Sequence, residues 1–129
     1  MQLLLDTQIF LWWFSSPEKI SKNVHTLLED EQNQLFLSAV SALEIAIKAR
    51  LKKLSLPDEP SIYLLTRMAV AKIHPLAISI EHALGVGDLE AIHEDPFDRL
   101  LISQAKAEGM GLVTSDKTIL KYSIRTIKA

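Results

Sequence analysis

The sequence predicts a single α/β domain over residues 1–129, a three-layer sandwich with helices on both faces of a mainly parallel sheet. Short apolar runs that suit buried strands alternate with longer segments of helical periodicity, as parallel strands with helical crossovers require. The chain has 129 residues, of which 48% are hydrophobic, so it suits one domain with a substantial core.

The first part of the chain begins with a strand. The run "QLLL" at 2–5 is short and continuous, as in a strand buried on both faces. The aromatic segment 9–14 follows too closely for a hairpin, so we expect a helix there. Residues 15–33 place Pro17 near a helix start and continue with amphipathic spacing, and 34–40 is a second strand.

The segment 41–54 is the clearest helix, because Leu43, Ile47, Leu51 and Leu54 recur on one face. A breaker containing two prolines follows it. The second half of the chain then continues the alternation of helices and strands. We expect helices at 61–72, 79–90 and 96–109, an extended piece at 72–78, a strand at 110–116, helical turns at 117–122 and a closing edge strand at 124–129.

The overall composition excludes several classes of protein. The formal net charge is −2, which gives no bulk basic field for general nucleic-acid binding, and the absence of cysteine excludes disulfide frameworks and thiolate chemistry. The apolar N-terminus lacks a basic region and a cleavage site, and no run reaches the length of a membrane span. We therefore expect a soluble protein of the cytoplasm, without a membrane partner.

Four acids fall where a parallel sheet concentrates its chemistry. Asp6 closes the first strand and Asp116 closes the strand "GLVT", so both belong at the carboxyl edge of the sheet. Glu44 lies in the first turn of the helix that follows the second strand, which starts at the same edge. Asp98 lies in the first turn of the helix that feeds "GLVT", and topology alone does not assign it to the cluster.

Each acid also has a purely structural interpretation. Asp6 and Asp116 suit turns. The segment "SALE" is typical of a capping box, in which Ser41 caps the helix and the Glu44 side chain accepts a hydrogen bond from the Ser41 backbone N–H. Asp95 before Pro96 is a good N-cap, which makes Asp98 an N3 residue favoured by the helix dipole. The alternative is one site, in which close carboxylates repel by about 4 kcal/mol per pair at an effective dielectric of 20 and require a hard divalent ion.

The segments "LLLDT", "LSAVSALEIAIKARLKKLSLP", "HEDPFDRLLISQAKAEG" and "LVTSD" together resemble a PIN-domain ribonuclease, and most closely the VapC-type toxins of bacterial type II toxin–antitoxin pairs. The resemblance covers nearly the whole chain in the family's order. It implies that Asp6, Glu44, Asp98 and Asp116 are the catalytic acids, which hold one or two Mg²⁺ or Mn²⁺ ions. It also implies an RNA substrate, a cognate antitoxin and a homodimer.

Other residues near the motifs have weaker roles. Many relatives carry His, Asn or Ser where this chain has Gln8, so we do not assign Gln8 as a ligand. Thr7, Thr114 and Ser115 are candidates to support the acids by hydrogen bonds. Trp12 and Trp13 suit the core, or a groove for a partner helix.

Several charged and imidazole side chains remain open between two roles. Lys48, one turn after Glu44, either pairs with it or reaches a substrate phosphate, and Arg99 has the same two options. The four histidines, at positions 25, 74, 82 and 93, lack metal-ligand spacing, and we expect surface or core roles for them.

The resemblance implies metal-assisted hydrolysis of RNA phosphodiester bonds. Two other classes share the length and sheet. A receiver-like signalling module would need paired acids after the first strand and a lysine after the last, and "LLLDTQ" has a single acid. A catalytically silent PIN-like binding partner would use the acids only as caps.

Overall fold

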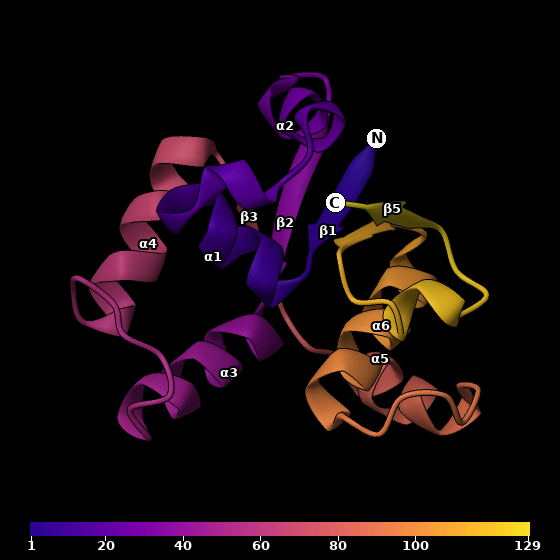
Figure 1. Ribbon diagram of the computed structural model, residues 1–129. Coiled ribbons are helices and arrows are strands. Elements are labelled where there is room, and N and C mark those ends of the chain that lie inside the picture. Colours follow the sequence, from indigo (N-terminus) through magenta and orange to yellow (C-terminus); the bar gives the residue numbers. More distant parts are fainter.

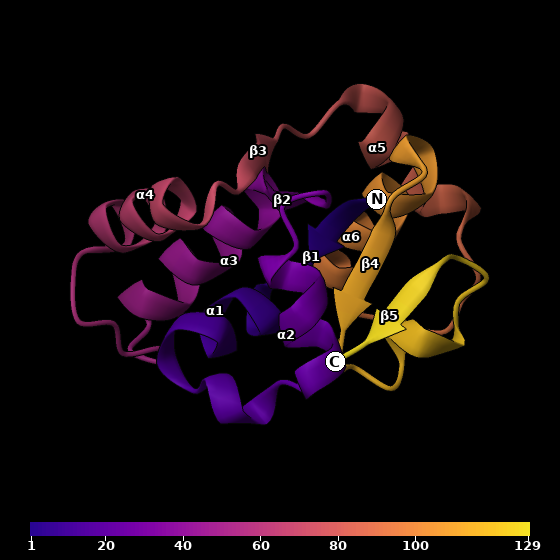
Figure 2. The same cartoon turned by 90° about the horizontal axis from the view of Figure 1, so that it is seen from above.

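The computed structural model describes residues 1–129 as one five-stranded sheet with helices on both sides. All pairings between neighbouring strands are parallel, and Figure 2 shows the strand order β3-β2-β1-β4-β5 across the molecule. The predicted three-layer α/β class is confirmed, and the closing strand is at an edge. The strands are β1 (Gln2–Leu5), β2 (Gln34–Ser38), β3 (His74–Leu76), β4 (Gly111–Thr114) and β5 (Thr126–Lys128).

The helices fill the connections between the strands. Figure 1 shows α1 and α4 on one side of the sheet and α5 and α6 on the other. None of the helices is both long enough and apolar enough to span a bilayer. The helices are α1 (Thr7–Ser15), α2 (Lys22–Glu29), α3 (Ala39–Arg50), α4 (Pro60–Ala71), α5 (Ile80–Gly85) and α6 (Pro96–Glu108), with 3₁₀ turns η1 (Pro17–Lys19), η2 (Val86–Asp88) and η3 (Ile119–Lys121).

The central strand β1 separates two apolar cores. Alternate side chains of a strand face opposite sides of the sheet. Leu3 and Leu5 accordingly pack into a cluster with residues of α1, α2 and α4, whereas Leu4 packs into a second cluster with residues of α6. All three leucines are fully buried, which explains why this strand reads as a continuous apolar run.

Two helix starts differ from the prediction. The segment 15–33 contains a 3₁₀ turn followed by α2, whose N-cap is Ser21. Helix α3 begins at Ala39, because Ser38 caps it by accepting a hydrogen bond from the Val40 backbone N–H. The capping-box interpretation of Ser41 and Glu44 is therefore wrong, and Glu44 lies beyond the first turn of its helix.

The apolar face predicted for the segment 41–54 is largely exposed. Leu43, Ile47 and Leu51 are 50%, 39% and 57% exposed, while the buried side of α3 is formed by other residues, including Glu44 and Ile45. The helix also ends at Arg50 rather than at residue 54. Periodicity identified the helix correctly but did not identify the side that packs.

Helix α6 begins at the carboxyl edge of the sheet. A helix that feeds a parallel strand must run antiparallel to it, so its N-terminus lies where the strands end. Asp95 caps α6 through the backbone N–H groups of Phe97 and Asp98, as predicted, and Gly109 ends it in the left-handed conformation with φ 66°. The first turn of α6 therefore meets the starts of α1 and α3.

Candidate active site

A pocket of about 400 Å³ opens at the carboxyl edge of the sheet. It gathers side chains from the ends of β1 and β4 and from α1, α3 and α6. All four acids predicted from the sequence line it, and Asp95 joins them. The pocket residues are Asp6, Thr7, Gln8, Leu11, Glu44, Ile45, Lys48, Lys53, Leu54, Asp95, Asp98, Ser115 and Asp116.

Asp6 occupies the N-cap position of α1, yet its side chain makes no cap hydrogen bond. Its backbone N–H extends the sheet by donating to Val113 O at 3.0 Å. Its carboxylate instead faces the pocket and accepts a hydrogen bond from Thr114 Oγ1 at 2.7 Å. Burial raises the pKa of Asp6, the Thr114 hydroxyl opposes that shift, and the nearby charges of Glu44 and Asp116 add to it.

Thr114 connects two of the acids. Its hydroxyl donates to Asp6 and accepts from the backbone N–H of Asp116 at 3.0 Å. Thr114 is fully buried, and its hydroxyl links the end of β1 to the turn after β4. The expectation that Thr114 supports the acids by hydrogen bonding is confirmed.

Asp116 lies in the turn after β4. Its Oδ1 accepts the backbone N–H groups of Thr118 at 2.7 Å and Ile119 at 3.3 Å. Partial burial acts to raise the pKa of Asp116, but these N–H groups and His93 outweigh it and hold the pKa below its usual value. Asp116 is therefore a carboxylate at neutral pH.

Asp98 projects from the first turn of α6 into the same pocket. Burial, followed by the charges of Asp6 and Asp95, raises the pKa of Asp98 to about 7, and His93 partly opposes the shift. A raised pKa shows that the pocket disfavours another negative charge. A bound cation would reverse that preference.

Glu44 is buried and forms an ion pair with Lys48, one turn further along α3, at 2.5 Å. Of the two roles considered for Lys48, the structure shows the pairing with Glu44. The hydrogen bond to Glu44 is the main cause of the raised pKa of Lys48. The lysine itself is about half exposed and also borders the pocket.

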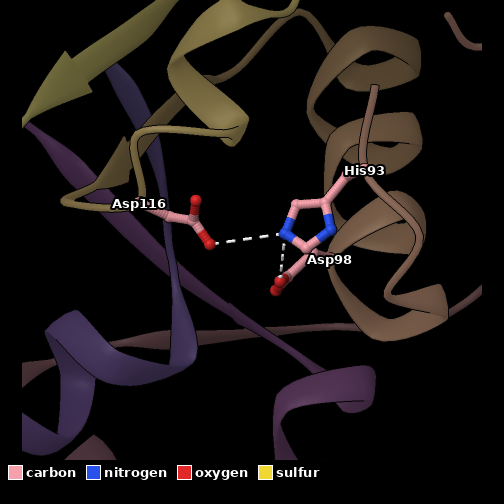
Figure 3. Close-up of side chains that lie close together, drawn as sticks. All are labelled: His93, Asp98 and Asp116. Atoms are coloured by element: carbon pink, nitrogen blue, oxygen red, sulfur yellow. Dashed lines mark hydrogen bonds and ion pairs between the residues drawn. The ribbon is translucent and has the colours of Figure 1, made fainter. Parts of the chain in front are cut away.

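His93 is the residue that the sequence analysis missed. Figure 3 shows its ring between Asp98 and Asp116, with Nε2 at 2.9 Å from Asp98 Oδ2 and 3.4 Å from Asp116 Oδ2. The expectation of an ordinary surface or core role is wrong for His93. The signal was its place in the loop directly before the cap of the helix that carries Asp98.

Arg99 does neither of the things considered for it. Its guanidinium donates to the backbone carbonyls of Val86, Glu90 and His93, so it fastens the loop before α6. Among the other candidates, Thr7 donates to Ser41 Oγ at 2.8 Å, joining α1 to α3. Gln8 and Ser115 line the pocket.

The pocket contains more negative than positive side chains. Five carboxylates line it, against the ammonium groups of Lys48 and Lys53. One candidate group for a metal ion is His93, Asp98 and Asp116, whose ligand atoms all lie within 4.8 Å of one another. The five carboxylates of the pocket supply oxygen ligands, which fit a hard divalent cation, and such an ion would relieve the repulsion that burial intensifies.

The parallel sheet with an acidic pocket at its carboxyl edge defines an α/β domain with a candidate cation site. The family model of the PIN domain matches residues 3–124. The chain therefore belongs to the PIN-domain family, as its resemblance to that family predicted, and the receiver-like alternative is set aside.

Known relatives agree with this assignment. The chain is 27% identical over 123 residues to Ribonuclease VapC22 of Mycobacterium tuberculosis, a match that covers 93% of this chain and 91% of that one. Its fold is similar to VapBC2 from Rickettsia felis, solved bound to a promoter DNA fragment, with TM-score 0.75, 18% identity and coverage of 99% and 98%. VapBC-1 from nontypeable Haemophilus influenzae gives TM-score 0.66 at 16% identity, with the same coverage.

Proposed function

We propose that this PIN-domain protein is a divalent-metal-dependent endoribonuclease and acts as the toxin of a type II toxin–antitoxin pair. The observation that carries the proposal is the convergence of Asp6, Glu44, Asp98 and Asp116 from four separate segments of the chain in one pocket. Structural caps and turns do not require such convergence. A site for one or two Mg²⁺ or Mn²⁺ ions does.

The four acids would hold the metal, and three of them are oriented by a neighbouring group. Asp6 is oriented by Thr114, Asp116 by the backbone N–H groups after it, and Glu44 by Lys48. When bound, the ion supplies a water of lowered pKa and stabilises charge on the phosphate and the leaving oxygen. Because Asp98 has a pKa raised to about 7, the ion and a proton compete for it near neutral pH.

RNA is the substrate that the relatives and the charges around the pocket favour. A curated relative is a ribonuclease and covers most of the chain. Lys48 and Lys53 border the acidic pocket, where they are placed to contact phosphates on either side of the cleaved bond. Because cellular RNA would be the target, we place the activity in the cytoplasm.

Two protein partners follow from the same proposal. The structural neighbours are described as VapBC or toxin–antitoxin complexes, which supports a cognate antitoxin for this chain. The exposed apolar side chains of Leu43 and Ile47 on α3, and of Leu51 at its C-terminal end, supply a surface for a homodimer.

The test is cleavage of total cellular RNA with and without Mn²⁺, comparing the wild type with Asp6→Asn. We expect Asp6→Asn to lower cleavage by more than about a hundredfold, the upper end of losses for residues that only support a metal ligand. Asp88→Asn, at an exposed acid of η2, is the matched control, and we expect it to retain activity.

Product ends are mapped by sequencing, and folding of each variant is checked by circular dichroism. Undiminished cleavage by folded Asp6→Asn would reject the assignment. Absence of cleavage by the wild type, with ion binding intact, would instead favour a catalytically silent PIN-like binding protein.

A further inference from the structure

His93 is anchored beside the acids by hydrogen bonds of its own backbone. Its N–H donates to the Tyr122 hydroxyl at 2.7 Å, and its carbonyl accepts from Arg99 at 3.2 Å. Arg99 also donates to the Tyr122 hydroxyl at 3.3 Å, which closes a small network. The side chain is only 17% exposed, so the ring has a defined position before any ion binds.

A backbone donor sets the protonation pattern of this ring. The N–H of Asp95 donates to Nδ1 of His93 at 3.2 Å, so Nδ1 must carry a lone pair. The ring hydrogen is then on Nε2. Nε2 donates to Asp116 Oδ2 at 3.4 Å, and Asp98 Oδ2 lies 2.9 Å from the same nitrogen.

This pattern is the opposite of what a metal ligand needs. A histidine that binds a metal through one nitrogen presents a lone pair there and donates the N–H of its other nitrogen to a neighbour. In His93 the nitrogen that faces the acids carries the hydrogen, and the remote nitrogen is the acceptor. Proximity to Asp98 and Asp116 therefore does not make His93 a ligand.

We infer that His93 is a positioning residue of the acidic site: its Nε2–H draws Asp98 and Asp116 together and orients them for the cation. This inference rests on the proposed function. The two acids come from different elements, α6 and the turn after β4, and their charges repel. An N–H donor between them reduces that repulsion.

The first test reads the ring directly and does not involve activity. Nitrogen-15 NMR of histidine-labelled, metal-free full-length protein at neutral pH should show His93 with a protonated Nε2 and an unprotonated Nδ1. His93→Gln assigns the signals by removing them. A ring protonated at Nδ1 alone would overturn the inference, because Nε2 would then be free to bind a metal.

The second test uses Mn²⁺ as the probe. Electron spin echo modulation of the Mn²⁺-loaded protein should show no directly bound imidazole nitrogen. A strong nitrogen coupling that disappears in His93→Gln would overturn the inference, because it would identify His93 as a ligand.

The affinity for Mn²⁺ distinguishes a positioning role of His93 from a general structural one. We expect His93→Ala to weaken Mn²⁺ binding by about ten- to hundredfold, the usual loss on removing a group that supports a ligand. His93→Gln should restore most of the affinity, since its amide places a donor near the former Nε2. His74→Gln, an exposed histidine of β3, is the control.

Equal affinities of wild type and His93→Ala would overturn the inference, as would a His93→Gln affinity no better than that of His93→Ala. If the wild type bound no Mn²⁺, the proposed function would fail. The NMR result on the wild type would still decide whether His93 donates to the two acids, whatever the folding of the variants.

Discussion

Two histidines of this protein have the same local chemistry and opposite surroundings. His82 and His93 each accept a backbone N–H at Nδ1, from Ser79 and Asp95 respectively, and each turns Nε2 toward a carboxylate. His82, at 4% exposure, is a residue of α5 whose ring contacts Gln104 and Glu108 of α6, whereas the His93 ring lies between Asp98 and Asp116, two acids that line the pocket. The two regions differ in the side chains that surround each histidine–carboxylate contact.

Around His82, the polar groups satisfy one another. Gln104 is fully buried, and its side-chain amide donates to Ala77 O and approaches His82 Nδ1, while its oxygen accepts from Ser38 Oγ. Ser103 Oγ donates to the His82 carbonyl at 2.6 Å. The network ties the end of β2 and the start of α5 to α6, and its function is structural.

Around His93, carboxylates outnumber cationic partners. The raised pKa values of Asp6 and Asp98 show that the pocket resists further negative charge in the absence of a cation. A histidine–carboxylate contact thus stabilises the fold where the surrounding polar groups are all paired, as they are around His82. Around His93 the excess of carboxylates lacks cationic partners, so the fold keeps these negative charges at a cost in stability, as binding sites commonly do.

The largest change in stability should come from breaking the complete network. We expect Gln104→Ala to destabilise the protein by about 3 kcal/mol, because it leaves a cavity and removes partners of buried polar groups. Urea denaturation followed by circular dichroism measures this. Ser123→Ala, an exposed position, is the control, and a loss no greater than that of the control would show that the network is dispensable.

Removing one negative charge from the acidic pocket should instead stabilise the metal-free protein, by less than Gln104→Ala destabilises it. Without divalent ions at pH 7, Asp6→Asn should melt at a higher temperature than the wild type, because burial and neighbouring acids penalise the Asp6 carboxylate. Asparagine can still accept from Thr114. Mn²⁺ should raise the melting temperature of the wild type and not of Asp6→Asn, and equal shifts in both would contradict the assignment.

The pH dependence follows from the raised pKa of Asp98. A carboxyl group whose pKa is higher in the folded state stabilises the fold below its unfolded pKa, and this contribution is lost as pH rises through the folded value. The metal-free protein should therefore lose stability between about pH 4 and the folded pKa of about 7.

Melting temperatures measured across that pH range check this, and Asp98→Asn should reduce the slope. Asp116, whose pKa is lowered, contributes with the opposite sign and below this window. A steeper fall in Asp98→Asn than in the wild type would contradict the prediction.

The smallest effect should come from the exposed half of an ion pair. Lys48→Gln should change the free energy of unfolding by no more than about 0.5 kcal/mol, because Lys48 is half exposed and pairs within one helix turn. Chemical denaturation at low and high salt measures it. A loss of several kcal/mol would mean that Glu44 depends on Lys48 for its burial.

Topology explains which acids could be placed from the sequence. Asp6 and Asp116 follow strands, and parallel strands end at one edge, so their proximity could be predicted. Asp98 could have been placed the same way, because a helix that feeds a parallel strand begins at that edge. Only the family resemblance had assigned Asp98 to the site.

Local patterns could not choose between equivalent residues. Ser38 and Ser41 are both good N-caps, and only the hydrogen bond of Ser41 with Thr7 in the folded chain separates their roles. The apolar face of Leu43, Ile47 and Leu51 identified a helix, but the neighbours of α3 decided which side was buried.

The sequence by itself determined the α/β class, the order of the elements and the cap at Asp95, because periodicity and capping act over a few residues. Only the tertiary structure decided that His93 meets Asp98 and Asp116, that Arg99 turns to backbone carbonyls, and that Gln104 completes a buried network. The physical reason is range. A hydrogen bond needs its two atoms within about 3 Å, and a sequence pattern specifies a face of an element but not the atom that the face will meet.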